Sequence, residues 1–178
     1  IPDRIEAGTF LIAVAATGGK VKLNNVEPKH MESVISLLRK SNIDILEEKD
    51  SIIITSNGLN INACDMETHE YPGFPTDLQA QWMLLMSLAS GNSTIKENIY
   101  FDRFTHILEL NRLGCDVHLE GGSASIKGGR SLFGAHVMST DIRASAALII
   151  AALCAEGCTN ISRVYHIDRG YDKIEEKL

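Results

Sequence analysis

The 178-residue sequence has little of what marks several special classes of protein. Its four cysteines are scattered, which is not a disulfide framework and fits a reducing cytosol. No apolar run approaches the roughly 18 residues that span a membrane. The net charge is -6 and there is no basic stripe, so nothing indicates a surface for nucleic acid or an anionic membrane. We therefore expect a cytoplasmic protein with no nucleic-acid or membrane partner.

Motifs for common cofactors and metals are also missing. The sequence contains no G-x-G-x-x-G, no Walker loop, no H-E-x-x-H and no Ser-His-Asp context. Cys154 and Cys158 are four residues apart at the end of a predicted helix, but no third or fourth ligand lies in range. Two buried, small apolar side chains are the favoured interpretation of this pair. We expect no cofactor and no metal site.

What the sequence does contain is an internal repeat. Each copy follows the plan helix, strand, helix, strand, strand, and the copies span about 1–62, 63–137 and 138–178. The alignment is clearest where Asn42-Ile43-Asp44-Ile45 matches Gly114-Cys115-Asp116-Val117. Helices are predicted at 8–17, 28–41, 76–91, 102–114, 140–157 and from 168, and strands at 20–26, 43–46, 51–55, 93–99, 115–119, 123–127 and 159–164.

The chain also shows two signs of being a fragment. It begins Ile-Pro-Asp-Arg without an initiator Met, and copy three stops before its last two strands. We therefore expect a truncated third repeat within a single domain, 1–178.

Two of the predicted helices are apolar on every side. They are 78–90 (LQAQWMLLMSLAS) and 142–156 (IRASAALIIAALCAE), and a helix without a polar face belongs in a protein interior. The strands at 51–55 and 93–97 alternate instead, so one face of each sheet is expected to meet water. We predict an α/β (or α+β) fold with buried helices inside and half-exposed sheets outside, which inverts the usual α/β barrel.

Polar residues mark the starts of both apolar helices. Thr76 and Gln79 have the spacing of a capping box, in which each side chain satisfies a free backbone N–H. Asp77 and Asp141 at the helix starts also suit the helix dipole. These residues alone are explained by helix capping.

Arginines at predicted helix starts are harder to explain by capping. Arg143 in a first turn opposes the dipole, and Arg103 and Arg169 each follow an Asp at a predicted helix start. One interpretation is simple ion pairing with the neighbouring Asp. The other is an anion site, in which guanidinium groups and helix N-termini hold phosphate or carboxylate. His166 is either part of such a site or the end of a strand.

Four stretches resemble a known family. They are 1–10 (IPDRIEAGTF), 72–81 (PGFPTDLQAQ), 140–146 (TDIRASA) and 165–171 (YHIDRGY), and they resemble the UDP-N-acetylglucosamine 1-carboxyvinyltransferases, which are enolpyruvyl transferases. The resemblance covers essentially the whole chain. It implies two similar domains, each an inside-out α/β barrel of three βαβαββ units, with the active site between them. This chain would be most of one domain, and the missing second domain would be its partner.

The resemblance also implies a reaction. Enolpyruvyl moves from phosphoenolpyruvate to the 3-hydroxyl of UDP-N-acetylglucosamine and phosphate is released, which is the first committed step of peptidoglycan synthesis. Alternatives are an enolpyruvyl transferase of the same architecture acting on shikimate phosphate, and a non-catalytic binding domain of the same fold.

Several residues match functional positions of the family. Asp77 matches the aspartate that contacts the reacting sugar hydroxyl, a candidate general base. Arg143 and Arg169 match arginines that bind the charged groups of phosphoenolpyruvate. Ile99 matches a position whose backbone contacts the sugar nucleotide. Supporting positions in the motifs are matched by Asp3, Arg4, Arg103 and Asp141.

The sequence departs from the family in two respects. Phe101 stands where the family commonly has Glu. None of the four cysteines matches the family's general acid, which lies on a loop of the other domain, and the family's N-terminal lysine and asparagine are missing too. We therefore expect the chain by itself to be inactive.

Overall fold

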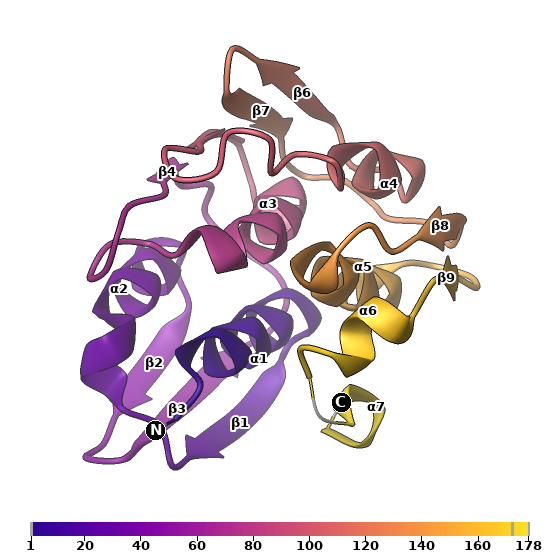
Figure 1. Ribbon diagram of the computed structural model, residues 1–178. Helices are drawn as coiled ribbons and strands as arrows, with labels where there is room; N and C mark the ends of the chain where they lie inside the picture. The colour runs from indigo at the N-terminus through magenta and orange to yellow at the C-terminus, as the bar shows by residue number, and fades with distance from the viewer. Residues whose placement is uncertain (1, 172, 178) are drawn as a thin grey trace.

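The computed structural model describes residues 2–171 and 173–177. Three long helices pack against one another at the centre of the molecule (Figure 1). They are α1 (Arg4–Thr17), α3 (Gln79–Leu88) and α5 (Ile142–Cys154). Each contacts the other two. Leu11, Trp82 and Leu148, one from each helix, are completely buried. The predicted interior position of the apolar helices is therefore confirmed.

The first repeat places a sheet against α1. Strands β1 (Gly19–Asn24), β3 (Ser51–Ser56) and β2 (Asp44–Glu47) pair antiparallel in the order β1-β3-β2. Ile52 and Ile54 of β3 are fully buried, whereas Leu46 of β2 is exposed. The short 3-10 helix η1 (Pro28–Met31) and α2 (Glu32–Lys40) form the second predicted helix of this repeat.

The second repeat has the same plan with one additional strand. Its sheet has the order β4-β5-β7-β6, and α4 (Ile107–Arg112) follows β5. The strands are β4 (Met66–Glu67), β5 (Asn92–Lys96), β7 (Ser123–Lys127) and β6 (Val117–Glu120). β4 pairs parallel to β5, and the other two pairings are antiparallel.

The third repeat begins with the parallel pair β8 (His136–Met138) and β9 (Asn160–Ser162), with α5 between them. Strands β4 and β8 were not predicted, because two or three residues are too few to show an alternating pattern. They give repeats two and three a strand before the central helix. Ile1 of the first family motif lies outside the described residues.

The predicted helix starts at 8, 102 and 168 are wrong. Helix α1 begins at Arg4, four residues before the predicted start. Residues 101–106 form turns, and α4 begins only at Ile107, so Arg103 lies before the helix. Asp168 is the last residue of α6 (Tyr165–Asp168), and Arg169 caps its C-terminus before α7 (Ile174–Lys177). Of the three arginines, Arg143 alone is in the first turn of a helix. Of the three predicted helix starts with an arginine, the start of α5 alone therefore places one at a helix N-terminus.

None of the helices in the described ranges combines the length and the apolar character needed to cross a bilayer.

Candidate functional site

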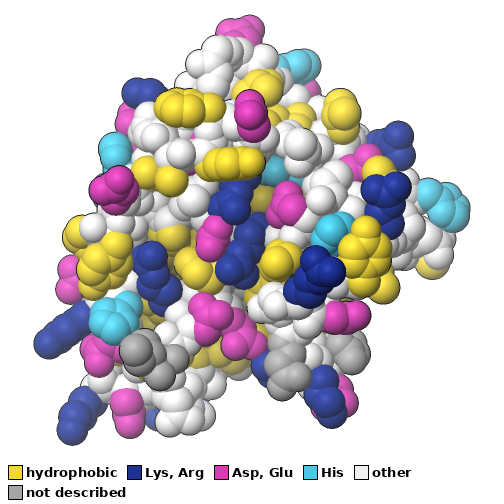
Figure 2. Space-filling model, in the orientation of Figure 1, with side chains coloured by type: hydrophobic (Ala, Val, Ile, Leu, Met, Phe, Trp, Pro, Cys, Tyr) yellow, Lys and Arg dark blue, Asp and Glu magenta, His cyan; other side chains and the backbone are white. Residues whose placement is uncertain are grey.

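A pocket of about 390 Å³ opens beside the starts of α3 and α5. Basic and acidic side chains lie together near the middle of this face of the molecule (Figure 2). The pocket is lined by Asp77, Arg103, Thr140, Asp141, Ile142, Arg143, His166 and Arg169. Three arginines face two aspartates, so the lining carries one excess positive charge. Five predicted site residues are brought together here from two repeats.

Asp77 lies between two arginines. Its Oδ1 accepts a hydrogen bond from Arg103 Nη1 at 2.5 Å, and its Oδ2 accepts one from Arg143 Nη2 at 3.3 Å. The side chains of Asp77, Arg103 and Arg143 are 33%, 24% and 20% exposed, so all three are partly withdrawn from water. Asp77 is far along the chain from both arginines. The interpretation that each arginine pairs with an Asp beside it in the sequence is therefore wrong for Arg103 and Arg143.

Asp141 has a different task from Asp77. It is the N-cap of α5, and its Oδ1 accepts from the backbone N–H groups of Arg143 at 2.8 Å and Ala144 at 2.9 Å. The sequence predicts Asp141 at the first helical position, where the dipole favours it; the structure places it one residue earlier, as the N-cap. By occupying those N–H groups, Asp141 leaves the guanidinium of Arg143 as the cationic group at this helix start.

A buried chain of hydrogen bonds fixes Arg143. Its Nη1 donates to Tyr171 Oη at 3.5 Å, and its Cζ lies 5.8 Å from the centre of the Tyr171 ring. The Tyr171 hydroxyl hydrogen-bonds Thr9 Oγ1 at 2.9 Å, and Gln81 Nε2 donates to the same Thr9 oxygen at 3.1 Å. Helices α1 and α3 thus both position the arginine of α5.

The second arginine is held by the segment before α3. Arg103 Nη1 lies 3.3 Å from Thr76 Oγ1, and its Cζ lies 5.6 Å from the centre of the Tyr100 ring. Thr76 donates its own proton to Glu97 Oε2 at 2.9 Å, and Gln79 Nε2 donates to the carbonyl of Arg103 at 3.1 Å. The predicted capping box of Thr76 and Gln79 is therefore wrong, because both side chains bind residues of the 97–103 segment instead.

Glu97, which supports the pocket through Thr76, was not predicted. It is only 1% exposed and lies directly after β5. The signal was present in the alternation of this strand, since Glu97 continues the face of Ser93 and Ile95, which are both buried. We interpreted a polar face of such a strand as wet, although the central helices cover this one.

His106 is buried beside the pocket. It is 1% exposed, and its Nε2 has no hydrogen-bond partner among the described residues. Burial lowers the pKa of His106 to about 4; Asp141 opposes this shift and Arg103 adds to it. The imidazole is therefore neutral at neutral pH.

The buried imidazole predicts a pH dependence of stability. The pKa of His106 in the folded protein, about 4, lies below the usual 6.5. Its contribution to the free energy of unfolding is therefore fully present above pH 6.5 and is lost as the pH drops toward 4. Between pH 7.5 and 5 we expect His106 to cost about 2 kcal/mol of unfolding free energy. Urea unfolding at several pH values checks this in wild type and His106→Gln. The unfolding free energy of the variant should not show this fall of about 2 kcal/mol with pH, whereas the exposed control His136→Gln should show it. An equal fall in all three proteins would contradict it.

The remaining predicted residues lie outside this pocket. Asp3 caps α1 by accepting from Ile5 N at 2.8 Å, and Arg4 lies over the Tyr71 ring at 5.1 Å. Both line another hollow, with Tyr71 among its walls. Ile99 is 41% exposed, and its backbone N–H donates to Glu97 Oε1 at 2.9 Å.

The cysteines and His166 give a mixed outcome. His166 lies in α6 and lines the pocket, so it is not the end of a strand. Cys154 packs against the core, and burial raises its pKa to about 11, as expected for a structural thiol. Cys158 is exposed, so its predicted burial is wrong. In the described part of the chain no cluster of three or more His, Cys, Asp or Glu could hold a metal ion.

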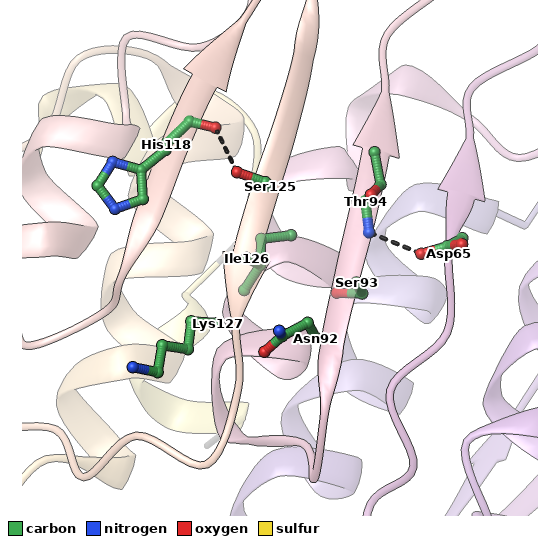
Figure 3. A pocket seen from close by; sticks show the side chains of 8 residues that line it. All are labelled: Asp65, Asn92, Ser93, Thr94, His118, Ser125, Ile126 and Lys127. Atoms are coloured by element: carbon green, nitrogen blue, oxygen red, sulfur yellow. Dashed lines mark hydrogen bonds between the residues drawn. The ribbon is translucent and has the colours of Figure 1, made fainter.

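A third hollow, of about the same 390 Å³ as the arginine pocket, lies across strands β5, β6 and β7 (Figure 3). Its polar groups are mainly side chains of the strands, and Asp65 accepts from the backbone N–H of Thr94 at 2.7 Å. His118 pairs with Asp116 at 2.9 Å, which leaves Lys127 as the cation of the lining. Equal volume therefore does not make equal sites, and the arginine pocket is the better candidate for binding an anion.

Comparisons with known proteins agree on one family. Residues 1–178 match the family model described as EPSP synthase (3-phosphoshikimate 1-carboxyvinyltransferase). The chain is 48% identical over 178 residues to the UDP-N-acetylglucosamine 1-carboxyvinyltransferase of Geobacter metallireducens. It is 52% identical over 179 residues to the protein of the same name from Aliarcobacter butzleri. Both alignments cover 100% of this chain and 42% of the relative, so the chain spans less than half the length of these relatives.

Solved structures show the same fold at lower identity. The enolpyruvyl transferase NikO from Streptomyces tendae superposes with a TM-score of 0.92 at 24% identity, covering 100% of this chain and 42% of NikO. An EPSP synthase from Acinetobacter baumannii superposes with a TM-score of 0.75 at 17% identity, covering 97% of this chain and 44% of that one.

Proposed function

Because this chain belongs to the EPSP synthase (3-phosphoshikimate 1-carboxyvinyltransferase) family of enolpyruvyl transferases, we propose that it is one domain of an enzyme that moves enolpyruvyl from phosphoenolpyruvate to the 3-hydroxyl of UDP-N-acetylglucosamine. The observation that carries this proposal is the pair of arginines around Asp77, with Arg169 on the same pocket. The names of relatives at 48–52% identity support the choice of acceptor. The proposal makes the enzyme a cytoplasmic one, at the first committed step of peptidoglycan synthesis.

The proposed domain comprises three repeats, at about 1–62, 63–137 and 138–178. The support is the recurrence of a buried central helix in each, namely α1, α3 and α5, and of the parallel pairs β4-β5 and β8-β9 around α3 and α5. We infer that the complete enzyme builds the inside-out barrel of βαβαββ units from these repeats. The second domain would form the other wall of the active site.

The pocket offers a base and an anion cradle for this reaction. Asp77 takes the proton of the sugar hydroxyl while the hydroxyl oxygen forms a bond to C2 of phosphoenolpyruvate. Arg143 and Arg169 hold the carboxylate and phosphate through charge-assisted hydrogen bonds. The substrate anions compete with Asp77 for the guanidinium of Arg143. This competition frees Oδ2 of Asp77 to accept the proton of the sugar hydroxyl.

Proton transfer at C3 of phosphoenolpyruvate needs a group beyond this pocket. C3 of the enol must gain a proton in the addition step and lose one when the C2–O bond to phosphate breaks. No cysteine is among the side chains that line the pocket. We propose that the acid belongs to the second domain.

The acceptor is the point on which the main alternative differs. Shikimate phosphate remains a second candidate because the family model carries the name of the enzyme that uses it. Phosphate release by the full-length protein should be measured with phosphoenolpyruvate and each acceptor in turn. We expect release with UDP-N-acetylglucosamine and none with shikimate phosphate; the reverse pattern would overturn the proposed acceptor.

The isolated chain of residues 1–178 is expected to release no phosphate from the two substrates. It supplies the proposed base and arginines but no cysteine among the side chains that line the pocket, and only one wall of the cleft. A colorimetric phosphate assay with the full-length protein as positive control checks this. Turnover by the isolated chain would show that the catalytic groups are complete within it.

A further inference from the structure

Glu97 has an unusual environment for a carboxylate. It is buried at the end of β5, yet its hydrogen-bond donors are neutral groups. Oε1 accepts from the hydroxyl of Thr68 at 2.7 Å and from the backbone N–H groups of Ile99 and Tyr100 at 2.9 Å each. Oε2 accepts from the hydroxyl of Thr76 at 2.9 Å. A buried carboxylate satisfied by four donors fixes the position of all four.

The first oxygen of Glu97 shapes the turn after β5. The two N–H groups that converge on Oε1 belong to consecutive residues, Ile99 and Tyr100. Thr68, which also donates to Oε1, accepts in turn from the N–H of Asn98 at 2.9 Å. The backbone of 98–100 is thereby fixed to the segment after β4, and with it the Tyr100 ring that lies beside Arg103.

The second oxygen of Glu97 sets the polarity of Thr76. A hydroxyl has one proton, and Thr76 gives it to Glu97. The lone pairs of the same oxygen are then free to face Arg103 Nη1, which is 3.3 Å away and also donates to Asp77. Arg103 thus donates to Thr76, and Thr76 donates to Glu97. If Glu97 became a donor to Thr76, the Thr76 proton would have to turn away from Glu97, and the hydrogen bond from Arg103 would be lost.

We propose that Glu97 is a positioning residue, which holds the Arg103–Asp77 pair and the Ile99–Tyr100 backbone in the geometry that the substrates require. This inference rests on the proposed function. Glu97 lies outside the lining of the pocket and acts through Thr76. The carboxylate is required because it accepts at both oxygens.

Glu97→Gln tests this requirement with little change of shape. If the amide oxygen keeps the three donors of Oε1, the NH₂ group faces Thr76 and donates to it. The Thr76 proton must then point elsewhere, and toward Arg103 it would meet another donor. Thr76→Val removes the same link without touching Glu97. The matched control is Glu120→Gln, an exposed glutamate at the end of β6.

The experiment measures kcat and KM for both substrates in the full-length protein, together with the melting temperature. We expect Glu97→Gln and Thr76→Val each to lower kcat/KM by about 10- to 100-fold, with most of the protein still folded. The double variant should lose little more than either single one, because both changes break one link. Glu120→Gln should match wild type. Normal kcat/KM per folded molecule in Glu97→Gln, or fully additive losses, would overturn the proposal.

A second readout separates this inference from the proposed reaction. The guanidinium NMR signals of Arg103 and the hydrogen exchange of the Ile99 and Tyr100 amides report the geometry without any substrate. We expect Glu97→Gln to shift the Arg103 signals. Exchange at those amides should speed up only moderately, because a neutral amide oxygen keeps their hydrogen bonds but accepts more weakly than a carboxylate. If wild type turns over neither acceptor, the proposed function fails while these signals still test the positioning. Unchanged signals in Glu97→Gln would overturn the positioning role.

Discussion

Replacing Asp77 with Asn in the full-length enzyme is expected to lower kcat by about 10²- to 10⁴-fold, the range that a positioned general base contributes. Asn has nearly the same shape but does not take a proton from the sugar hydroxyl. Phosphate release under saturating substrates gives kcat, and a thermal melt reports the fold. The matched control is Asp50→Asn, in the exposed turn between β2 and β3.

The fold should survive this change. Asp77 pairs with Arg103 and Arg143, but its side chain is one-third exposed, so solvent screening limits each pair to about 1 kcal/mol or less. If Asp77 only positions the arginines, the loss will appear in KM for phosphoenolpyruvate while kcat stays near wild type. That result would reject Asp77 as the base.

Arg143→Ala is expected to raise KM for phosphoenolpyruvate by roughly 10²- to 10³-fold. This is the cost of removing one partner of the charge pair that Arg143 forms with the bound substrate anion, from which water is excluded. Arg143→Lys should restore little, because a lysine does not reproduce the planar fork that reaches both Asp77 and Tyr171. Steady-state kinetics at varied phosphoenolpyruvate measures both. Arg112→Ala removes an exposed arginine of α4 and should leave KM unchanged.

The same variant decides between an enzyme and a binding domain. A non-catalytic domain of this fold predicts that Arg143→Ala leaves turnover of the full-length protein intact. Unchanged kcat and KM would therefore reject the anion-binding role of Arg143 and favour that alternative.

Local patterns predicted the secondary structure best where several residues carried the same signal. The helices α1, α3 and α5 were found because their apolar sequences span ten or more residues. The start of α4 was misplaced by five residues, since Asp102 and Arg103 have the composition of a helix start but form a turn. Composition at a helix end is a weak guide when the same side chains have tertiary partners.

The sequence by itself determined the buried central helices, the polar start of α5 and the family motifs. Each depends on neighbouring residues or on a pattern of apolar side chains, which the chain displays in one dimension. Only the tertiary structure decided that Asp77 bonds Arg103 and Arg143, which are 26 and 66 residues away, and that Thr76 serves Glu97 instead of a helix end. A polar side chain pairs with whichever donor or acceptor packing brings within about 3 Å, and that depends on the whole fold.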